Sequence, residues 1–459
     1  MSHSTPHPSH VKSVRDHVQE LMPQLTQDLA NYVAIPGVAF PGYPPEAIQE
    51  AHDFVVSLLR AEGVTDIQKI ELPNTSPAVF ATIPGPEGAP TVLLYTHYDV
   101  VPEGNTAEWK TPAFTATPKD GVIYGRGTAD SKGNFLLHLG ALRYFGGKPP
   151  VTLKIVVEGQ EEFGSAFDAY PPLAPELFAA DAMIIADVGN IRPGVPTVTV
   201  ALRGAATVDV EVNTLANPKH SGMFGGAAPD SVLVLLHALA ALHNKNGDVA
   251  VPGLRRNEWQ GTTYTAEEFR ELAEILPGVP EFGTGDLGQR IWSGPAISVI
   301  GIDIPSVDRS LNAVSAHTRA RLNLRVHPEQ DVHEAQQALV SFLEDLTPLG
   351  VPLTVIPGEA GNGYAARTDG TAFKLLSGAM TDAWEAEATT AAAGGSIPLV
   401  NSLQEAVPGA EILLFGVADG FSAIHAPNER VVITEIENSL LAEILFLERL
   451  AETSAASNS

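Results

Sequence analysis

Between residues 91 and 186 the chain alternates strand-length apolar runs with a helical segment, and this alternation constrains the fold more than any other feature. The runs lie at 91–95, 151–157 and 182–186, and they are rich in β-branched residues. The segment 131–145 separates the first two runs and has the apolar periodicity of a helix. Strands and helices in alternation predict an α/β layered domain with a largely parallel sheet.

After residue 202 this pattern changes. The segments 206–213 and 320–326 alternate polar with apolar residues, as half-exposed antiparallel strands do. Helices are expected at 231–243 and 332–346, so this part of the chain is predicted to be a small α+β unit. Other expected elements are a helical stretch over 11–62, a short strand at 353–356, a strand at 411–417 and a closing helix near 435–451.

The return of the α/β pattern from residue 369 indicates that the second unit is inserted into the first. A chain of 459 residues is also too long for a single hydrophobic core. We therefore predict a first catalytic part at 1–202, an inserted lid or dimerisation domain at 203–363 and a second catalytic part at 364–459.

Composition narrows the classes of function. The chain has 54 acidic and 27 basic residues, a formal net charge of −27, which argues against nucleic-acid and membrane-surface partners. It has no cysteine, so a bound metal must be held by His, Asp and Glu, which suit zinc, manganese or cobalt. Residues 1–20 are polar and no apolar run has the length of a membrane span, so we expect a cytoplasmic enzyme.

Acidic residues and histidines stand directly after predicted strands at four places. In open α/β sheets, ligands bind at the carboxyl ends of the strands, so clusters that are distant in sequence can converge there. A further carboxylate, Asp130, lies in the glycine-containing segment 125–133 just before a predicted helix. A single histidine after a strand is usually a loop residue, and a single Glu-Glu pair usually lies on the surface. Five such clusters in order are less easily explained without a shared function. The four clusters are His97 with Asp99, Glu161 with Glu162, Asp187, and His425.

The charges of these clusters favour two divalent ions. Asp130, Glu162 and Asp187 supply three negative charges, His97 and His425 are neutral ligands, and two divalent ions supply four positive charges. The remaining positive charge favours a bound hydroxide, which is the nucleophile that amide hydrolysis needs at neutral pH.

Two residues beside these ligands suit supporting roles. Asp99 is placed to accept a hydrogen bond from the second ring nitrogen of His97. Glu161 is adjacent to a ligand and is free to act as general base on the bridging water.

Four motifs make the pattern specific, and they resemble the motif series of the M20 metallopeptidases. That family includes carnosinase-like dipeptidases, aminoacylases, succinyl-diaminopimelate desuccinylase and the glutamate carboxypeptidases. The resemblance covers nearly the whole chain. The motifs are HYDVVP at 97–102, GRGTADSKG at 125–133, EGQEEFGS at 158–165 and IHAPNE at 424–429.

The resemblance implies a set of ligands for each of two metal ions. Asp130 would bridge both ions, His97 and Asp187 would complete one site, and Glu162 and His425 the other. Zinc is the expected metal, with manganese or cobalt as alternatives.

The resemblance also implies a fold and an assembly. The fold would be α/β, a phosphorylase/hydrolase-like mixed-sheet catalytic domain with an inserted α+β lid and dimerisation domain. The inserted domain would form a homodimer through edge-strand pairing and a helix face. Asp99 would be the orienting residue, Glu161 the general base, and the peptide bond after Asp130 would be cis.

Candidate substrate residues lie in the inserted domain and after it. His220 begins the segment HSGMFGG, which by itself is a glycine-rich turn, but it matches a family histidine that stabilises the oxyanion, often across a dimer interface. Asn312 and Arg325 match positions that contact the substrate carboxylate, and an Arg holds a carboxylate through two hydrogen bonds. The residues Gly394, Gly395 and Ser396 resemble the substrate loop of the carnosinase-like branch.

Two departures from the family pattern lie near the substrate. Residues 391–393 are alanines where members commonly carry an Arg and an acidic residue, and NAVS at 312–315 is a loose version of the usual sequence. The preferred hypothesis is a dinuclear dipeptidase acting on dipeptides or small peptides. The alternatives are an aminoacylase or desuccinylase acting on N-acyl amino acids, and a catalytically silent dimer that binds a small ligand.

Overall fold

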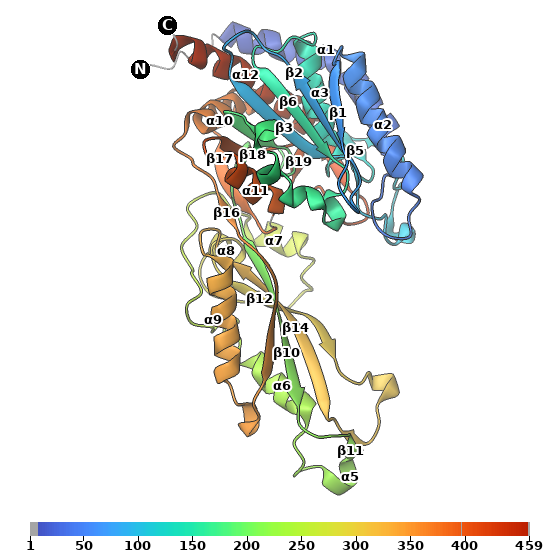
Figure 1. The fold of residues 1–459 in the computed structure, drawn as a ribbon, viewed down its shortest axis with the longest axis vertical. Coiled ribbons are helices and arrows are strands. Elements are labelled where there is room, and N and C mark those ends of the chain that lie inside the picture. The colour runs from blue at the N-terminus through green and yellow to red at the C-terminus, as the bar shows by residue number, and fades with distance from the viewer. Residues whose placement is uncertain (1–7, 396, 458–459) are drawn as a thin grey trace. The chain divides into compact units, whose positions relative to one another are not determined.

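A computed structural model describes residues 8–395 and 397–457 of the chain (Figure 1). The chain divides into two compact units. The first unit comprises Met1–Val200, Ala366–Ala391 and Leu399–Ser459, and the second comprises Ala201–Ala365 with Ala392–Pro398.

The first unit is built on a mixed sheet with the strand order β1-β2-β6-β3-β7-β18-β9, and β17 also pairs with β9. The central strands β6, β3, β7 and β18 run parallel to one another, whereas β1, β2 and β9 pair antiparallel. The strands are β1 (Asp66–Ile70), β2 (Ala78–Ile83), β3 (Thr91–His97), β6 (Thr152–Glu158), β7 (Ala182–Ile185), β9 (Thr197–Leu202), β17 (Thr389–Ala393) and β18 (Glu411–Leu414).

Helices α1, α2, α3, α10 and α12 of the first unit share one hydrophobic core with this sheet. Helices α1, α3, α10 and α12 pack against one another, and α2 contacts β2. Among the helices of the described residues, none is both long and apolar enough to cross a membrane. The helices are α1 (Pro8–Val33), α2 (Pro45–Ala61), α3 (Lys132–Tyr144), α4 (Pro175–Phe178), α10 (Thr371–Trp384), α11 (Pro398–Ala406) and α12 (Ile433–Ser457).

The first unit also contains short strands that pair with one another outside the main sheet. Strands β4 and β5 form a hairpin that β20 extends, and β8 pairs with β19. Their bounds are β4 (Thr117–Lys119), β5 (Val122–Tyr124), β8 (Gly189–Asn190), β19 (Ala418–Asp419) and β20 (Arg430–Val432).

The parallel register brings the ends of three central strands to one edge of the sheet. His97, the last residue of β3, pairs with Glu158, the last residue of β6, and Tyr95 pairs with Ile185, which ends β7. Residues just beyond Glu158 and Ile185 therefore emerge beside His97. This register is the reason that segments 60 to 90 residues apart in sequence can share a site.

Three local predictions differ from the structure. The helical stretch expected over 11–62 is two helices, because residues 34–44 contain three prolines and two glycines, of which Gly42 has a φ of +96°. The sheet, expected to be largely parallel, is parallel only at its centre. The antiparallel outer strands were not predicted, because a buried apolar run does not reveal the direction of its strand. The strand expected at 411–417 ends at Leu414.

The second unit is a four-stranded antiparallel sheet with the order β12-β14-β10-β15. On β10 buried and half-buried residues alternate, so one face carries the apolar core. Helices α6 and α9 pack on this sheet. The strands are β10 (Gly204–Asn213), β12 (Ala296–Asp303), β14 (His317–Val326) and β15 (Thr354–Gly361), and the helices are α6 (Ser231–Ala240) and α9 (Val332–Asp345).

Smaller elements of the second unit lie in the connections between these strands. A two-residue ladder joins β11 to β13, and β16 pairs with Ala201 and Leu202. The elements are β11 (Lys219–His220), α5 (Ser221–Phe224), α7 (Ala266–Leu272), α8 (Leu287–Ile291), β13 (Ala313–Val314) and β16 (Tyr364–Ala365).

Candidate metal centre

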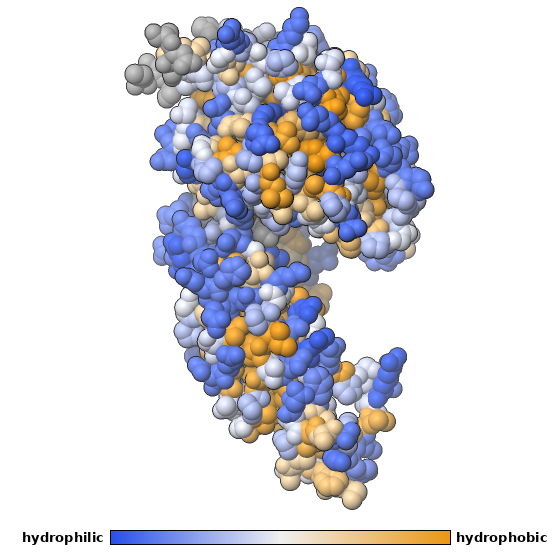
Figure 2. Space-filling view, viewed as in Figure 1, coloured by the Kyte–Doolittle hydropathy of each residue, from blue (hydrophilic) through white to orange (hydrophobic). Residues whose placement is uncertain are grey.

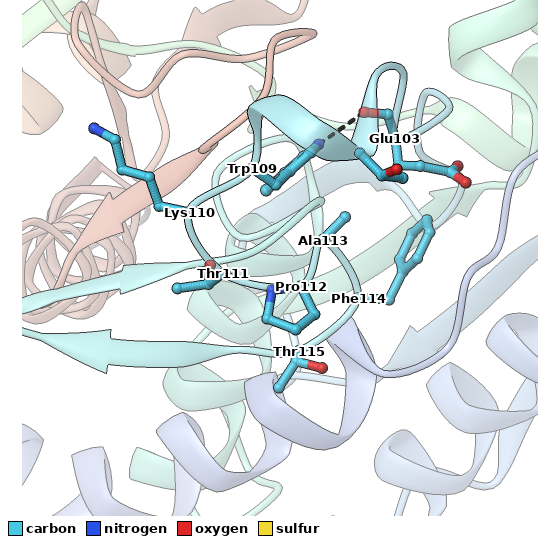
Figure 3. Close-up of a pocket in the computed structure, with 9 residues that line it drawn as sticks. Glu103, Trp109, Lys110, Thr111, Pro112, Ala113, Phe114 and Thr115 are labelled. Carbon is cyan, nitrogen blue, oxygen red and sulfur yellow. Dashed lines mark hydrogen bonds between the residues drawn. The ribbon is translucent and has the colours of Figure 1, made fainter.

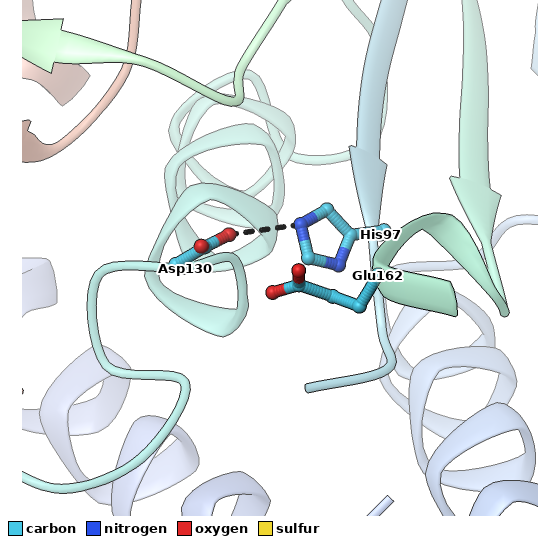
Figure 4. Close-up of side chains that lie close together, drawn as sticks. All are labelled: His97, Asp130 and Glu162. Atoms are coloured by element: carbon cyan, nitrogen blue, oxygen red, sulfur yellow. Dashed lines mark hydrogen bonds and ion pairs between the residues drawn. The ribbon is translucent and has the colours of Figure 1, made fainter. Parts of the chain in front are cut away.

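His97 lies at the centre of the cluster in the first unit and is fully buried. Its Nε2 atom lies 3.0 Å from Asp130 Oδ1 and 3.1 Å from Asp187 Oδ1. Figure 4 shows the ring of His97 facing Asp130, with the carboxylate of Glu162 beside it. The end of β3, the loop before α3 and the residues after β7 therefore meet at one ring nitrogen.

His425 approaches the other side of the same aspartate. Its Nε2 atom lies 3.1 Å from Asp130 Oδ2 and 2.9 Å from Glu162 Oε2. Each oxygen of Asp130 thus faces a different histidine, which is the arrangement that a bridging carboxylate needs. His425 has a φ of 61°, and its side chain is 54% exposed.

The cluster has the donor set of a metal site. The ligand atoms of His97, Asp130 and Glu162 lie within 4.8 Å of one another, as do those of His97, Glu161 and Asp187. Two ligand atoms in tetrahedral positions around zinc, each about 2.0–2.1 Å from the ion, are about 3.3 Å apart. The nitrogen–oxygen distances of 2.9–3.1 Å found here are close to that spacing.

The electrostatics of the cluster also call for added positive charge. Burial, together with the charge of Asp187, raises the pKa of Glu161 to about 10, and burial beside Asp130 raises the pKa of Glu162 to about 7. Hydrogen bonds to Asp130 and Glu162 raise the pKa of His425 to about 10. A buried carboxyl group with a raised pKa is unstable in its ionised form, and a bound divalent cation stabilises that form. The charges of these residues therefore fit metal binding.

Asp99 is fully buried, and it contacts the cluster through both its side chain and its backbone. Its Oδ1 lies 3.3 Å from Nδ1 of His97, and its backbone carbonyl lies 3.0 Å from the same nitrogen. The two carboxylate oxygens of Asp99 also accept the backbone N–H groups of Glu161 and Glu162, at 3.0 and 3.1 Å. Asp99 therefore orients the His97 ring and fixes the backbone that carries both glutamates.

A hydrogen-bond network next to Asp130 was not predicted from the sequence. Asn134 donates to Ser131 Oγ and accepts the backbone N–H of Val417. Ser131 Oγ in turn donates to the carbonyl of Ala186 and lies 2.7 Å from Thr96 Oγ1. These residues tie together the segments that carry the candidate ligands. Their only sequence signal was their position beside the ligands, and the Asp130–Ser131 peptide is cis, as the resemblance implied.

A cavity of about 530 Å³ lies elsewhere in the first unit (Figure 3). All of its lining residues come from the loop between Glu103 and Thr115, and none is a candidate site residue. The loop is joined to the segment after His425, because Asn428 accepts the backbone N–H of Lys110 and donates to the carbonyl of Glu108.

The candidate residues of the second unit fall into two places. His220 pairs with Ala313 across the β11–β13 ladder, which brings it next to Asn312. Both residues are exposed. Arg325 lies near the far end of β14, eight residues beyond His317, or about 26 Å along an extended strand.

The glycine-rich substrate loop is only partly described. Gly394 and Gly395 are exposed, and the predicted substrate residue Ser396 lies outside the described residues. Ala391 and Ala392, which occupy positions where family members commonly carry polar residues, are buried.

A family model described as peptidase family M20/M25/M40 matches residues 93–453 of the chain. The chain belongs to this family. It is therefore a metallopeptidase, as the motif series predicted. The matched residues extend from β3 into α12 and include every candidate ligand of the metal centre.

Similar proteins include named dipeptidases. The cysteinylglycine-S-conjugate dipeptidase of Corynebacterium striatum is 39% identical over 368 residues, which cover 78% of this chain and 81% of that protein. The Beta-Ala-His dipeptidase of Homo sapiens is 26% identical over 414 residues, 84% of this chain and 80% of that protein.

Solved structures share the fold. The di-peptidase Dug1p from Saccharomyces cerevisiae has a TM-score of 0.79 at 22% identity, covering 98% of this chain and 99% of that one. Human carnosine dipeptidase 1 has a TM-score of 0.77 at 23% identity, covering 96% and 99%. These likenesses confirm the predicted α/β fold with a mixed sheet.

Proposed function

We propose that this metallopeptidase hydrolyses the peptide bond of dipeptides at a centre of two divalent metal ions. The observation that carries the proposal is Asp130, whose two carboxylate oxygens face His97 and His425 respectively. Relatives of this chain are named as dipeptidases, and no relative named above is an aminoacylase. The aminoacylase alternative is therefore not favoured, and the intact ligand set argues against a silent ligand-binding dimer.

In this proposal Asp130 would hold both ions, together with His97 and Asp187 for one ion and Glu162 and His425 for the other. When bound, the ions would lower the pKa of water and polarise the scissile carbonyl group. Zinc suits His and carboxylate ligands at these spacings, and manganese or cobalt would accept the same set.

Glu161 is proposed as the general base. Its backbone is fixed by Asp99, and its carboxylate lies beside Asp187 and His97. The proposed ligand set does not include Glu161. A carboxylate in this position takes a proton from the attacking water and then gives it to the leaving amine.

His220 is proposed as the oxyanion donor. Its Nδ1 atom accepts the backbone N–H of Gly222 at 3.1 Å, so the neutral ring carries its proton on Nε2. An exposed Nε2–H group is available to donate to the oxyanion of the tetrahedral intermediate. The Gly-containing turn therefore selects the tautomer that this role needs.

Recognition of a free carboxylate is proposed for Arg325 and the loop of Gly394, Gly395 and Ser396, together with Asn312, which lies beside His220 and would come from the second subunit of a dimer. Among the described residues, the Arg325 guanidinium has no hydrogen bond or ion pair. Its neighbour Arg203 is buried and donates to the carbonyl of Ile291, and burial with the like charge of Arg325 lowers the pKa of Arg203 to about 10. An arginine beside a second positive charge favours an anionic group such as a peptide carboxylate.

A homodimer through the second unit is part of the proposal. Strand β12 lies at the edge of its sheet, and Val299, Ile300 and Ile302 on it are 41–57% exposed. Leu233 and Leu236 of α6 are also exposed. Figure 2 shows apolar surface at the tip around α5, where Met223 and Phe224 lie next to His220. Unpaired edge strands and exposed apolar side chains are features of subunit interfaces.

A dimer would also bring together two candidate substrate residues that lie far apart within one subunit. Arg325 and His220 lie near opposite ends of the second unit's sheet, so one copy of the unit cannot bring them to the same small substrate. In a symmetric dimer, His220 of one subunit would serve the metal centre of the other. The cytoplasmic location remains a prediction from the sequence.

The test is hydrolysis of a matched panel by zinc-loaded and chelated enzyme. The panel contains dipeptides, the same dipeptides with C-terminal amides, and N-acyl amino acids with the same C-terminal residue. We expect metal-dependent cleavage of free dipeptides and about tenfold or greater loss on the amides, because the amide removes the charge that Arg325 would bind. Cleavage of the N-acyl compounds alone would reject the dipeptidase proposal.

A further inference from the structure

Glu429 is a buried carboxylate four residues beyond His425, and it has no role in the proposed reaction. Its two oxygens accept four hydrogen bonds, all from the segment that leads to Asp130. The donors are Arg126 Nη1 at 2.7 Å and the backbone N–H groups of Gly127, Ala129 and Asp130 at 3.0, 3.0 and 3.1 Å. A side chain from the His425 segment therefore holds the backbone of the bridging aspartate.

The contact continues a short β-ladder. Strand β20 pairs with β5 through Arg430 and Tyr124, and the next residues of the two strands also bond, because Gly125 N–H donates to the carbonyl of Glu429. Beyond this point both segments leave the ladder and carry Asp130 and His425 to the metal centre. The Glu429 side chain replaces the ladder as the link between them.

The charge of Glu429 is balanced within the protein. Arg126 is 1% exposed, pairs with Glu429 and donates its second terminal nitrogen to the carbonyl of Pro102. Its guanidinium lies 5.3 Å from the ring centre of Trp109, one of the residues drawn in Figure 3. The partner charge is present and each Glu429 oxygen accepts two donors, so the Glu429 carboxylate is fully hydrogen-bonded, whereas Nε of Arg126 is buried without a hydrogen bond among the described residues.

We propose that Glu429 is a positioning residue for the metal centre, which sets the Asp130 carboxylate between His97 and His425. Among the described residues it is hydrogen-bonded to no candidate ligand side chain, and it acts through Arg126 and the backbone of residues 127–130. The role requires an acceptor-only group, since all four contacting atoms are donors. The inference rests on the proposed two-metal function.

The test uses Glu429→Gln in the full-length protein. Glutamine has nearly the same shape, but its NH₂ group would face two donors, so about half of the hydrogen bonds to the 126–130 segment are lost. We expect the apparent zinc affinity, measured by competition with a chelating indicator, to fall about 10- to 100-fold, as is typical when a group that orients metal ligands is removed. Peptidase activity should return at saturating zinc.

Glu435→Gln is the matched control. Glu435 is 2% exposed in the same unit and accepts hydrogen bonds from Asn190 Nδ2 and the backbone N–H of Gly194, but it is bonded to no residue of the 126–130 segment. The control should lower the thermal unfolding midpoint to a similar degree while leaving zinc affinity unchanged. If Glu429→Gln does not fold, Glu429→Asp retains the charge and should show an intermediate affinity.

Two results would overturn the inference, and they can be told apart. Wild-type zinc affinity in both folded Glu429 variants, or an equal loss in the Glu435 control, would leave the proposed function standing and remove the positioning role. Failure of the wild-type protein itself to bind zinc would remove the proposed metal centre and this role together.

Discussion

The metal centre of the first unit and the candidate substrate residues of the second unit are built in contrasting ways. His97 and Asp99 are fully buried, and each is held by neighbouring side chains and backbone groups. His220 and Asn312 are exposed, on a two-residue ladder with little packing around it. In the proposed reaction, the groups of the metal centre are therefore positioned before substrate arrives, whereas His220 and Asn312 would be completed by a partner subunit or a ligand.

The largest effect is expected from Glu161→Gln, which tests the preorganised side of this comparison. Removing the base should lower kcat by about 10³-fold, because proton transfer contributes about 10²- to 10⁴-fold in such reactions. Both metal ions should remain bound, since Glu161 is not a proposed ligand. Metal content by elemental analysis and kcat by steady-state hydrolysis provide the measurements.

Glu176→Gln, on the exposed surface of α4, is the control and should retain wild-type turnover. Substantial activity in Glu161→Gln would assign the base to another group. Loss of metal together with activity would instead place Glu161 among the ligands.

A smaller effect is expected from His220→Ala in the second unit. Loss of one oxyanion donor should reduce kcat by about 10²-fold with metal content unchanged. His317→Ala, which removes an exposed histidine bonded to Asn213 in the same unit, should have little effect. Kinetics paired with light scattering separate the two explanations of a loss: a variant that remains dimeric but slow supports the donor role, while a monomeric variant assigns the effect to assembly.

The smallest expected effect is on stability. The substitution Glu161→Gln, which should lower activity, should raise the stability of the metal-free protein at high pH. In the metal-free protein the pKa of Glu161 is raised from 4.5 to about 10 by burial and by Asp187, so the folded state holds a proton that the unfolded state releases above about pH 5. Metal-free wild type should therefore lose stability as the pH rises from about 6 to about 9. Metal-free Glu161→Gln should lose less and unfold at least about 2 °C higher near pH 9, measured by differential scanning calorimetry.

Added zinc should abolish that advantage, because the cation stabilises the wild-type carboxylates. Equal pH profiles for metal-free wild type and Glu161→Gln would show that the first unit carries no such destabilised charge. The contrast between the two units would then rest on geometry alone.

Much of the first unit could be predicted from the sequence. The apolar runs at 91–95, 151–157 and 182–186 each correspond to a central strand, and the helix expected at 131–145 is α3. The family and the fold class are confirmed by the comparisons, whereas the roles of the site residues and the domain functions stay predictions. Strand direction and helix ends were missed, because they depend on pairing and on turn geometry at residues 34–44.

The supporting residues were harder to predict than the ligands. Asn134, Ser131 and Glu429 contact neighbours up to 303 positions away, and their own types are common in loops and on surfaces. A hydrogen bond between distant segments leaves no periodic signal in the sequence. Only the folded chain reveals that these residues meet.

The sequence by itself determined the reaction chemistry of this protein: an acidic, cysteine-free chain with His, Asp and Glu clusters at the ends of strands is suited to a metal-dependent hydrolase. The tertiary structure decided that both oxygens of Asp130 face a histidine and that Asp99 and Glu429 hold the surrounding backbone. The physical reason is that residue types set which bonds can form, whereas the register of parallel strands and the burial of their ends set which atoms are close enough to form them.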